Sequence, residues 1–403
     1  MEKGVVVMIL PINLKTASTT LFIIYHFLLI FTVVILRKKL YYNASLYHIV
    51  IKILFTILLI GSLLTYFVYA EYIENRPDSL YIISTAEAVI HGENPYNISM
   101  PSYYGPVYNF LIAPVYLMPK NHKIVSYGVL ILSLMFLTSF LVVRKIGTRD
   151  PIFLAVVIAS DPLIHYYGIA LAQIDDMLMS FMIMLTLLIM IYGYEKLRII
   201  MIVVSSLVKP VGAFLLITLF NKGSMIKIVV AILLVLSLNI LSLYVYGEKF
   251  LYNVYLIHSG RSDGLTISFL LDNLFKRSFP QIFSYVAVLL SLLSPILVRD
   301  KDPIKIIMNS FIIFYIFTPL DFPEYLIWIT PVIILKTLLD KDLALSIFYS
   351  MTALIGRLWQ DLIQSTGDYY SLINSVLIIS YIALLTCLYV SINKDHRNKR
   401  QTR

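Results

Sequence analysis

Apolar segments near the length of a bilayer crossing recur along almost the whole chain, and this pattern limits the possible folds more than any other feature. A helix needs about 20 apolar residues to cross a membrane. Charged residues make up only 14% of the sequence, against about 25% in a soluble domain. The segments span about 18–36, 50–70, 124–143, 152–168, 171–192, 228–246, 281–298, 306–319, 326–338, 343–359 and 371–392. The sequence therefore predicts an all-α polytopic membrane protein with about 11 spans.

No soluble module interrupts this pattern, so we expect a single integral membrane domain over residues 1–403. Four parts of it stand out: a first outer loop at 71–123, a re-entrant segment at 199–220, a second outer loop at 247–280 and a basic cytoplasmic tail at 393–403. The net charge of +9 does not indicate nucleic-acid binding. We attribute it to basic loops, because Lys and Arg concentrate on the cytoplasmic side of membranes.

Basic groups between the segments predict the orientation. Those at 37–39, 144–145 and 394–403, with others between them, can all be cytoplasmic only if 199–220 enters and leaves on one side. Lys209–Pro210 lies near its middle, and proline breaks a helix, so two half-helices are expected there. Most carboxylates then fall outside. We expect a multi-pass protein of the cell membrane with its site on the outer face and its C-terminus in the cytoplasm.

A short helix is predicted in the first outer loop. Pro77 suits a first helical turn, and Gly92 followed by Pro95 indicates a stop. Polar and apolar residues separate onto two faces: Ser84, Glu87 and His91 on one, and Ile82, Ala86, Val89 and Ile90 on the other. This pattern is typical of a helix that lies in the membrane interface.

Asp78 is the candidate catalytic base. It falls in the first turn of that helix, where the dipole favours an ionised carboxylate. Sugar transfer from a polyprenyl phosphate needs a carboxylate to accept the acceptor's proton and cationic or N–H groups to stabilise the departing phosphate. Glu74 and Glu87 are alternative bases, and Glu87 also suits a solvated stripe. In the simpler interpretation, Asp78 only complements the dipole of its own helix.

An ordered set of motifs in the first half of the chain resembles a known family. It reads Pro77-Asp78-x-x-Tyr81, then Ala86, Gly92-x-Asn94-Pro95-Tyr96, Tyr104-Gly105-Pro106, Ala113-Pro114, Ala172-Gln173-x-Asp175 and Lys209-Pro210. This set is similar to the polyprenyl-phosphate-mannose-dependent mannosyltransferases of GT-C architecture, glycosyltransferase family 87. The resemblance covers about residues 60–220. Gly105 stands where the family usually has a proline, and Ala172 where it prefers glycine.

The resemblance implies a reaction. A hexose, most likely mannose in that family, would pass with inversion from a polyprenyl-phosphate donor to a lipid or glycan acceptor, with Asp78 as general base. Tyr81, Tyr96 and Glu87 are candidate substrate contacts. No nucleotide fingerprint or His/Cys metal cluster occurs in the sequence, so neither a cofactor nor a metal is expected.

Lys209 has two interpretations. A lysine inside an apolar segment costs about 2.5–3.5 kcal/mol on insertion scales and usually marks a function. It would meet the donor phosphate as a point charge. Alternatively it reaches an interface or pairs with Asp161 or Asp175.

Further polar residues are weighed in the same way. Gln173 and Asp175 are candidate sugar contacts at the start of a span. Adjacent helical residues point about 100° apart, so we expect that Asp175 and Asp176 do not jointly hold one ion. The sequence also predicts a buried pair of Asp161 with His165, donor phosphate binding by Arg261 in a flexible lid, and Asp321 and Glu324 lining the same cavity.

Two other functional classes remain open from the sequence. Broken helices with a mid-span cation also suit a transporter or lipid flippase, although we find no repeated halves. A non-catalytic scaffold of an envelope-assembly complex is the third possibility. Reconstitution with a labelled lipid-phosphate sugar separates them, because the label is transferred, flipped or left in place.

Overall fold

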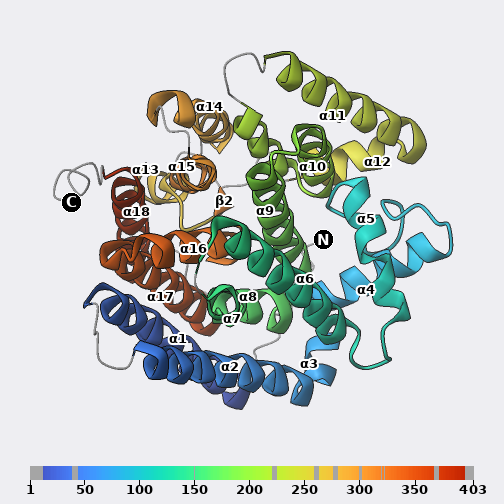
Figure 1. Ribbon diagram of the computed structural model, residues 1–403. Coiled ribbons are helices and arrows are strands. Elements are labelled where there is room, and N and C mark those ends of the chain that lie inside the picture. The colour runs from blue at the N-terminus through green and yellow to red at the C-terminus, as the bar shows by residue number, and fades with distance from the viewer. Residues whose placement is uncertain are drawn as a thin grey trace.

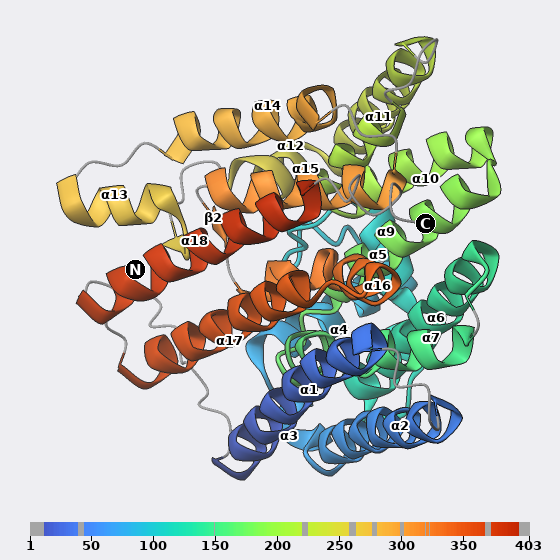
Figure 2. The same cartoon turned by 60° about the vertical axis from the view of Figure 1, so that its left-hand side comes forward.

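The computed structural model describes residues 12–38, 44–148, 150–219, 225–257, 263–275, 280–298, 302–318, 320–321, 323–366 and 372–394. Helices account for nearly all of these residues and pack side by side (Figure 1). The chain is an all-α polytopic membrane protein, as the sequence predicts. Two views show the N-terminal helices on one side of the bundle and α11 at its periphery on the other (Figures 1 and 2).

Every apolar segment falls on helical structure. The long helices are α1 (Ile12–Lys38), α2 (Ala44–Val68), α6 (Lys123–Ile146), α9 (Ile174–Tyr192), α11 (Met225–Tyr246), α17 (Leu343–Thr366) and α18 (Leu372–Asn393). Shorter elements between them are α7 (Pro151–Ala159), α8 (Pro162–His165), η2 (Tyr166–Ala170), α10 (Glu195–Val208), η3 (Pro210–Leu219), α14 (Pro280–Val298), α15 (Pro303–Phe317), η5 (Pro323–Trp328) and α16 (Thr330–Asp340).

The number of spans is smaller by a strict criterion. Among the described residues, 6 helices are long and apolar enough to cross a membrane, or up to 7 if the pair at 151–170, bent by 43°, forms one span. The predicted number of 11 is therefore not confirmed. Shortness explains part of the difference, since α15 and the Ile282–Ser294 part of α14 fall below a full crossing.

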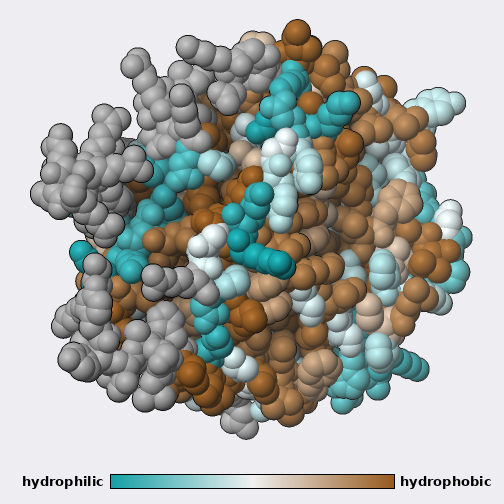
Figure 3. All heavy atoms as spheres, viewed as in Figure 1, coloured by the Kyte–Doolittle hydropathy of each residue, from teal (hydrophilic) through white to brown (hydrophobic). Residues whose placement is uncertain are grey.

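Large apolar side chains face outward over much of the bundle. Leu64 on α2 and Ile240 on α11 are 60% and 66% exposed, and brown apolar atoms cover much of the visible face in Figure 3. Such a surface is unfavourable in water and suits contact with lipid, where there is no hydrophobic cost.

The first outer segment folds into short helices on one side of the bundle (Figure 1). They are α3 (Ala70–Glu74), α4 (Pro77–Ile90), α5 (Pro106–Ile112) and the 3₁₀ helix η1 (Ala113–Leu117). Helix α4 begins at Pro77, and Gly92 after its end has a φ of 72°, which confirms both signals. Ile82 and Ala86 are buried as expected, but Ile90 is 45% exposed. Ile90 thus faces outward, and the interfacial position of this helix remains a prediction.

The second outer segment contains α12 (Glu248–Leu251), the π-helix η4 (Tyr252–Leu256), the strand β1 (Asp263–Gly264) and α13 (Ile267–Phe275). Strand β1 pairs in parallel with β2 (Leu320–Asp321), with Asp263 opposite Leu320 and Gly264 opposite Asp321. This two-residue pairing holds the segment against the connection that leads into η5.

Candidate active site

Asp78 is the second residue of α4 and remains accessible. Half of its side chain is exposed, and its Oδ2 lies 3.9 Å from Nη2 of Arg76. No side chain caps α4 by a hydrogen bond, so Asp78 does not serve as its cap. Burial raises the pKa of the Asp78 carboxyl, the Arg76 guanidinium opposes the rise, and the Asp175 carboxylate adds to it. A carboxylate that is open on one side and surrounded by protein on the others can receive a proton from a bound molecule.

Lys209 lies at the centre of a charged cluster. Its Nζ donates to Oδ2 of Asp175 at 2.8 Å and to Oδ1 of Asp176 at 2.5 Å. The same Oδ1 accepts a hydrogen bond of 2.6 Å from Nε1 of Trp328. The structure thus favours the pairing that the sequence left open for Lys209, and it makes Asp175 the partner, with Asp176 in addition.

The expectation that adjacent Asp175 and Asp176 do not share one cation is wrong. Both carboxylates contact the Lys209 ammonium. Both lie in the first turn of α9, and Lys209 approaches from another element. The 100° separation of the Cβ directions is overcome by side-chain rotation and by the reach of the lysine.

Aromatic rings surround the ammonium. Nζ of Lys209 lies 5.3 Å from the ring centre of Tyr104, 5.0 Å from that of Tyr325 and 4.9 Å from that of Trp328. Ring faces attract cations at this range. The cluster therefore stabilises Lys209 from several directions and joins the first outer loop, the α10 end and η5.

The backbone break at Lys209 places this cluster. Helix α10 ends at Val208, and Lys209 is extended with φ −145° and ψ 133°. Pro210 then begins η3, which runs back along α10: the Arg198 guanidinium near the start of α10 donates to the carbonyl of Thr218 near the end of η3 at 3.2 Å. This hairpin has the shape expected of a re-entrant pair, while its position in a membrane remains a prediction.

The two departures from the family pattern have structural reasons. The Gly105 amide donates to the Val208 carbonyl at 3.1 Å, and a Cβ at Gly105 would lie 2.0 Å from the carbonyl oxygen of Leu207. A side chain at this position is therefore excluded. Ala172 has a φ of 60°, a left-handed conformation that glycine adopts at little cost, which accounts for a glycine preference there.

The three other predicted substrate contacts in the first outer segment lie in different surroundings. The Tyr81 ring stacks on Tyr103 at 5.3 Å and meets Tyr104 edge-on, so Tyr81 links α4 to the cluster. Tyr96 is buried, and its hydroxyl donates to the Tyr104 carbonyl at 2.9 Å. Glu87 is exposed on α4.

Gln173 is half-buried beside Asp175, and no side-chain hydrogen bond caps α9 at this residue. Arg261, with the rest of the predicted lid at 258–262, lies outside the described residues. A substrate role for each of these side chains remains a prediction.

Glu74 and Asp161 form hydrogen bonds that stabilise the fold. Oε1 of Glu74 accepts a hydrogen bond of 2.6 Å from the Ile124 amide, which fixes the start of α6 and argues against Glu74 as the alternative base. The predicted Asp161–His165 pair is wrong: Asp161 binds the Leu163 amide and the Tyr349 hydroxyl, and His165 contacts the Ala159 carbonyl. Asp161 is the N-cap of α8 and its side chain turns to the Leu163 amide at the start of that helix, whereas His165 is the last residue of α8.

Glu324 joins the site from η5. Burial first, and the Asp176 carboxylate second, raise its pKa to about 8, which favours the protonated form. Asp78 and Lys209 are also near enough to act on it. Sequence patterns predict Glu324 only as a residue that lines the same cavity, because its approach to the site depends on contacts across more than a hundred residues.

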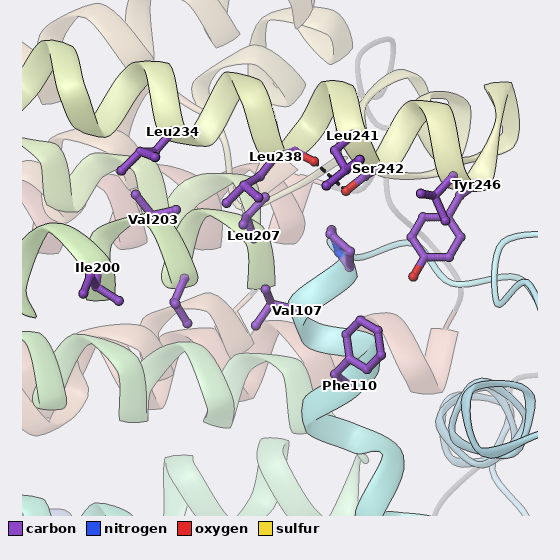
Figure 4. Close-up of a pocket in the computed structure, with 13 residues that line it drawn as sticks. Val107, Phe110, Ile200, Val203, Leu207, Leu234, Leu238, Leu241, Ser242 and Tyr246 are labelled. Carbon is purple, nitrogen blue, oxygen red and sulfur yellow. Dashed lines mark hydrogen bonds between the residues drawn. The ribbon is translucent and has the colours of Figure 1, made fainter. Parts of the chain in front are cut away.

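The protein also has an apolar groove of about 430 Å³ (Figure 4). It is formed by α5, α10 and α11, and its lining residues include Pro106, Leu207 and Leu241. Pro106 follows Gly105, and Leu207 lies two residues before Lys209. Part of the groove wall is therefore close in sequence to the residues of the charged cluster.

The fold and these polar residues define an integral membrane protein of many helices with a charged site and an apolar groove. A model of glycosyltransferase family 87 matches residues 103–300, just under half of the chain, and this match supports a membrane glycosyltransferase of GT-C type. The match includes Asp175 and Lys209 and begins after Asp78. It also extends beyond residue 220, where the sequence alone showed similarity only in hydropathy. A comparison with curated proteins gave no match.

Proposed function

We propose that this glycosyltransferase moves a hexose, mannose by resemblance, from a polyprenyl phosphate to an acceptor at the outer membrane face. The acceptor hydroxyl attacks the anomeric carbon, and Asp78 takes its proton. The bond from that carbon to the phosphate oxygen breaks, and its electron pair leaves with the phosphate. Attack opposite the leaving group inverts the anomeric centre.

The observation that carries this proposal is the position of Asp78. Its carboxylate is half exposed, and no hydrogen bond from the described residues reaches it. The Asp175 carboxylate acts electrostatically on Asp78, and Glu324 interacts electrostatically with Asp176, Lys209 and Asp78. A base must be accessible to substrate, and Asp78 has this property.

The groove in Figure 4 supports a lipid-borne donor. Its walls are almost entirely apolar, with Ser242 and Tyr246 as the residues with hydroxyl groups among those that line it. A polyprenyl chain in this groove would bring its phosphate toward the end of α10. The pairing of Lys209 with two carboxylates also weakens the transporter alternative, which relied on a mid-span cation.

The test is sugar transfer by the Asp78→Asn variant with polyprenyl-phosphate mannose and candidate acceptors. A lost general base lowers the rate by about 10²–10⁴-fold. Since the pKa of Asp78 is raised, wild-type kcat/KM should fall as pH decreases through a value above the usual one for aspartate, and this limb should vanish in the variant. Glu93→Gln, a change at an exposed residue of the same segment, is the control. Transfer by Asp78→Asn at the wild-type rate would remove Asp78 from the mechanism.

A further inference from the structure

Arg76 immediately precedes α4 and lies beside the proposed base. Its side chain is only 11% exposed, and Nη2 is 3.9 Å from Oδ2 of Asp78, which is too long for a hydrogen bond. Nε and Nη1 are buried and have no acceptor among the described residues. The guanidinium therefore has Asp78 as a loose ion-pair partner, while its Nε and Nη1 donors lack hydrogen-bond acceptors among the described residues.

Such an arrangement is unfavourable unless a ligand supplies the acceptor. Arginine stays charged in proteins and offers five N–H donors in a planar fork. Buried donors without acceptors destabilise a protein. Phosphate oxygens match the fork and accept two parallel hydrogen bonds.

The neighbouring cation is already occupied. Lys209 contacts two carboxylates at 2.8 and 2.5 Å and three aromatic rings. Its positive charge is more than balanced, and Asp175 and Asp176 would repel an approaching phosphate. Arg76 differs from Lys209, because its nearest carboxylate, that of Asp78, makes no hydrogen bond with it. Its donors therefore stay available to a phosphate.

We infer that Arg76 binds the phosphate of the lipid donor through its guanidinium and so places the sugar next to Asp78. The identity of the phosphate carrier rests on the proposed function, whereas the phosphate contact itself does not. The Arg76 charge also lowers the pKa of Asp78. A bound phosphate neutralises that charge, so donor binding makes Asp78 a stronger base.

Binding of polyprenyl phosphate without a sugar tests the inference, with polyprenol and inorganic phosphate as comparison ligands. Purified protein in detergent is titrated with each ligand. Arg76→Met should weaken polyprenyl phosphate binding by about ten- to a hundredfold, the range for a lost charged hydrogen bond, and leave polyprenol binding unchanged. Wild-type protein should prefer polyprenyl phosphate to inorganic phosphate, and the reverse order would overturn the assignment to a lipid-borne phosphate.

Arg198→Met is the matched control. Arg198 is 14% exposed, lies 3.8 Å from Glu195 and also has an Nε without an acceptor among the described residues, but it is near the opposite end of α10. Its loss should change phosphate binding less than twofold. An equal loss in both variants, or wild-type binding by Arg76→Met, would overturn the inference.

Arg76→Lys covers the case in which Arg76→Met does not fold. Lysine keeps the charge and removes the fork, so binding should weaken by several-fold, and unchanged binding would overturn the forked contact. Phosphate binding that depends on Arg76 in a protein without sugar transfer would contradict the proposed function alone. Transfer with phosphate binding that ignores Arg76 would contradict this inference alone.

Discussion

Asp161 and Asp78 both lie beside a proline at the start of a helix, yet their surroundings differ. Asp161 is 0% exposed, and its two oxygens accept hydrogen bonds of 2.7 Å from the Leu163 amide and the Tyr349 hydroxyl. Asp78 is half exposed, and its ion-pair partner among the described residues is the Arg76 guanidinium at 3.9 Å. A carboxylate whose oxygens are both occupied fixes the backbone, here the bend between α7 and α8. One that the fold leaves open is available to a substrate.

The same comparison applies to the cations. Lys209 is enclosed by carboxylates and rings, whereas Arg76 has buried donors without acceptors. Residue type and burial are similar in the two cases. A cation whose hydrogen-bond and charge partners are all in the protein has a structural role. A buried cation whose donors lack acceptors needs a ligand to supply them.

Lys209→Met should give the largest change in stability. It leaves Asp175 and Asp176 buried without their cation, which costs about 3–5 kcal/mol in comparable cases. Denaturation in detergent measures the effect, with Lys227→Met as the control, because Lys227 pairs with Glu195 at an exposed position and its loss should matter little. Normal stability combined with weaker donor binding would instead place Lys209 at the phosphate.

Tyr349→Phe should have an intermediate effect confined to stability. It removes a donor from the buried Asp161, and an unsatisfied acceptor costs about 1–3 kcal/mol. Sugar transfer per folded molecule should stay at the wild-type level. A large loss of transfer without a loss of stability would show that the Asp161 region takes part in the reaction, and the contrast with Asp78 would fail.

Ala172→Gly should give the smallest effect, and a favourable one. Ala172 lies between the Asp161 region and the start of α9 and has a φ of 60°. Glycine removes a strain of about 1–2 kcal/mol and loses part of that gain to the greater freedom of the unfolded chain. A rise in the thermal midpoint is expected. A lower midpoint would mean that the alanine methyl group contributes more by packing than its backbone conformation costs.

Local signals predicted the elements well, and long-range contacts set the limit. Pro77 and Gly92 bound α4 correctly, and Pro210 ends α10 where the sequence indicates. Trp328 reaches Asp176 across 152 positions and Tyr349 reaches Asp161 across 188, and no spacing rule predicts such partners.

Two misses at the site have specific causes. Asp175 and Asp176 both contact the Lys209 ammonium because their side chains rotate toward it. A helical wheel shows only the Cβ directions and does not predict this contact. Arg76 precedes the helix and belongs to no periodic face, so sequence patterns gave it no role. Its unpartnered donors become visible only when the surrounding atoms are placed.

The tight junction at Gly105 has a mechanical consequence. Its amide is bonded to the Val208 carbonyl, and no space remains for a side chain. The neighbouring Tyr104 ring faces Lys209. The loop with Tyr104 and Gly105 must therefore move together with the end of α10. Whatever opens to admit a bulky substrate must therefore be hinged elsewhere.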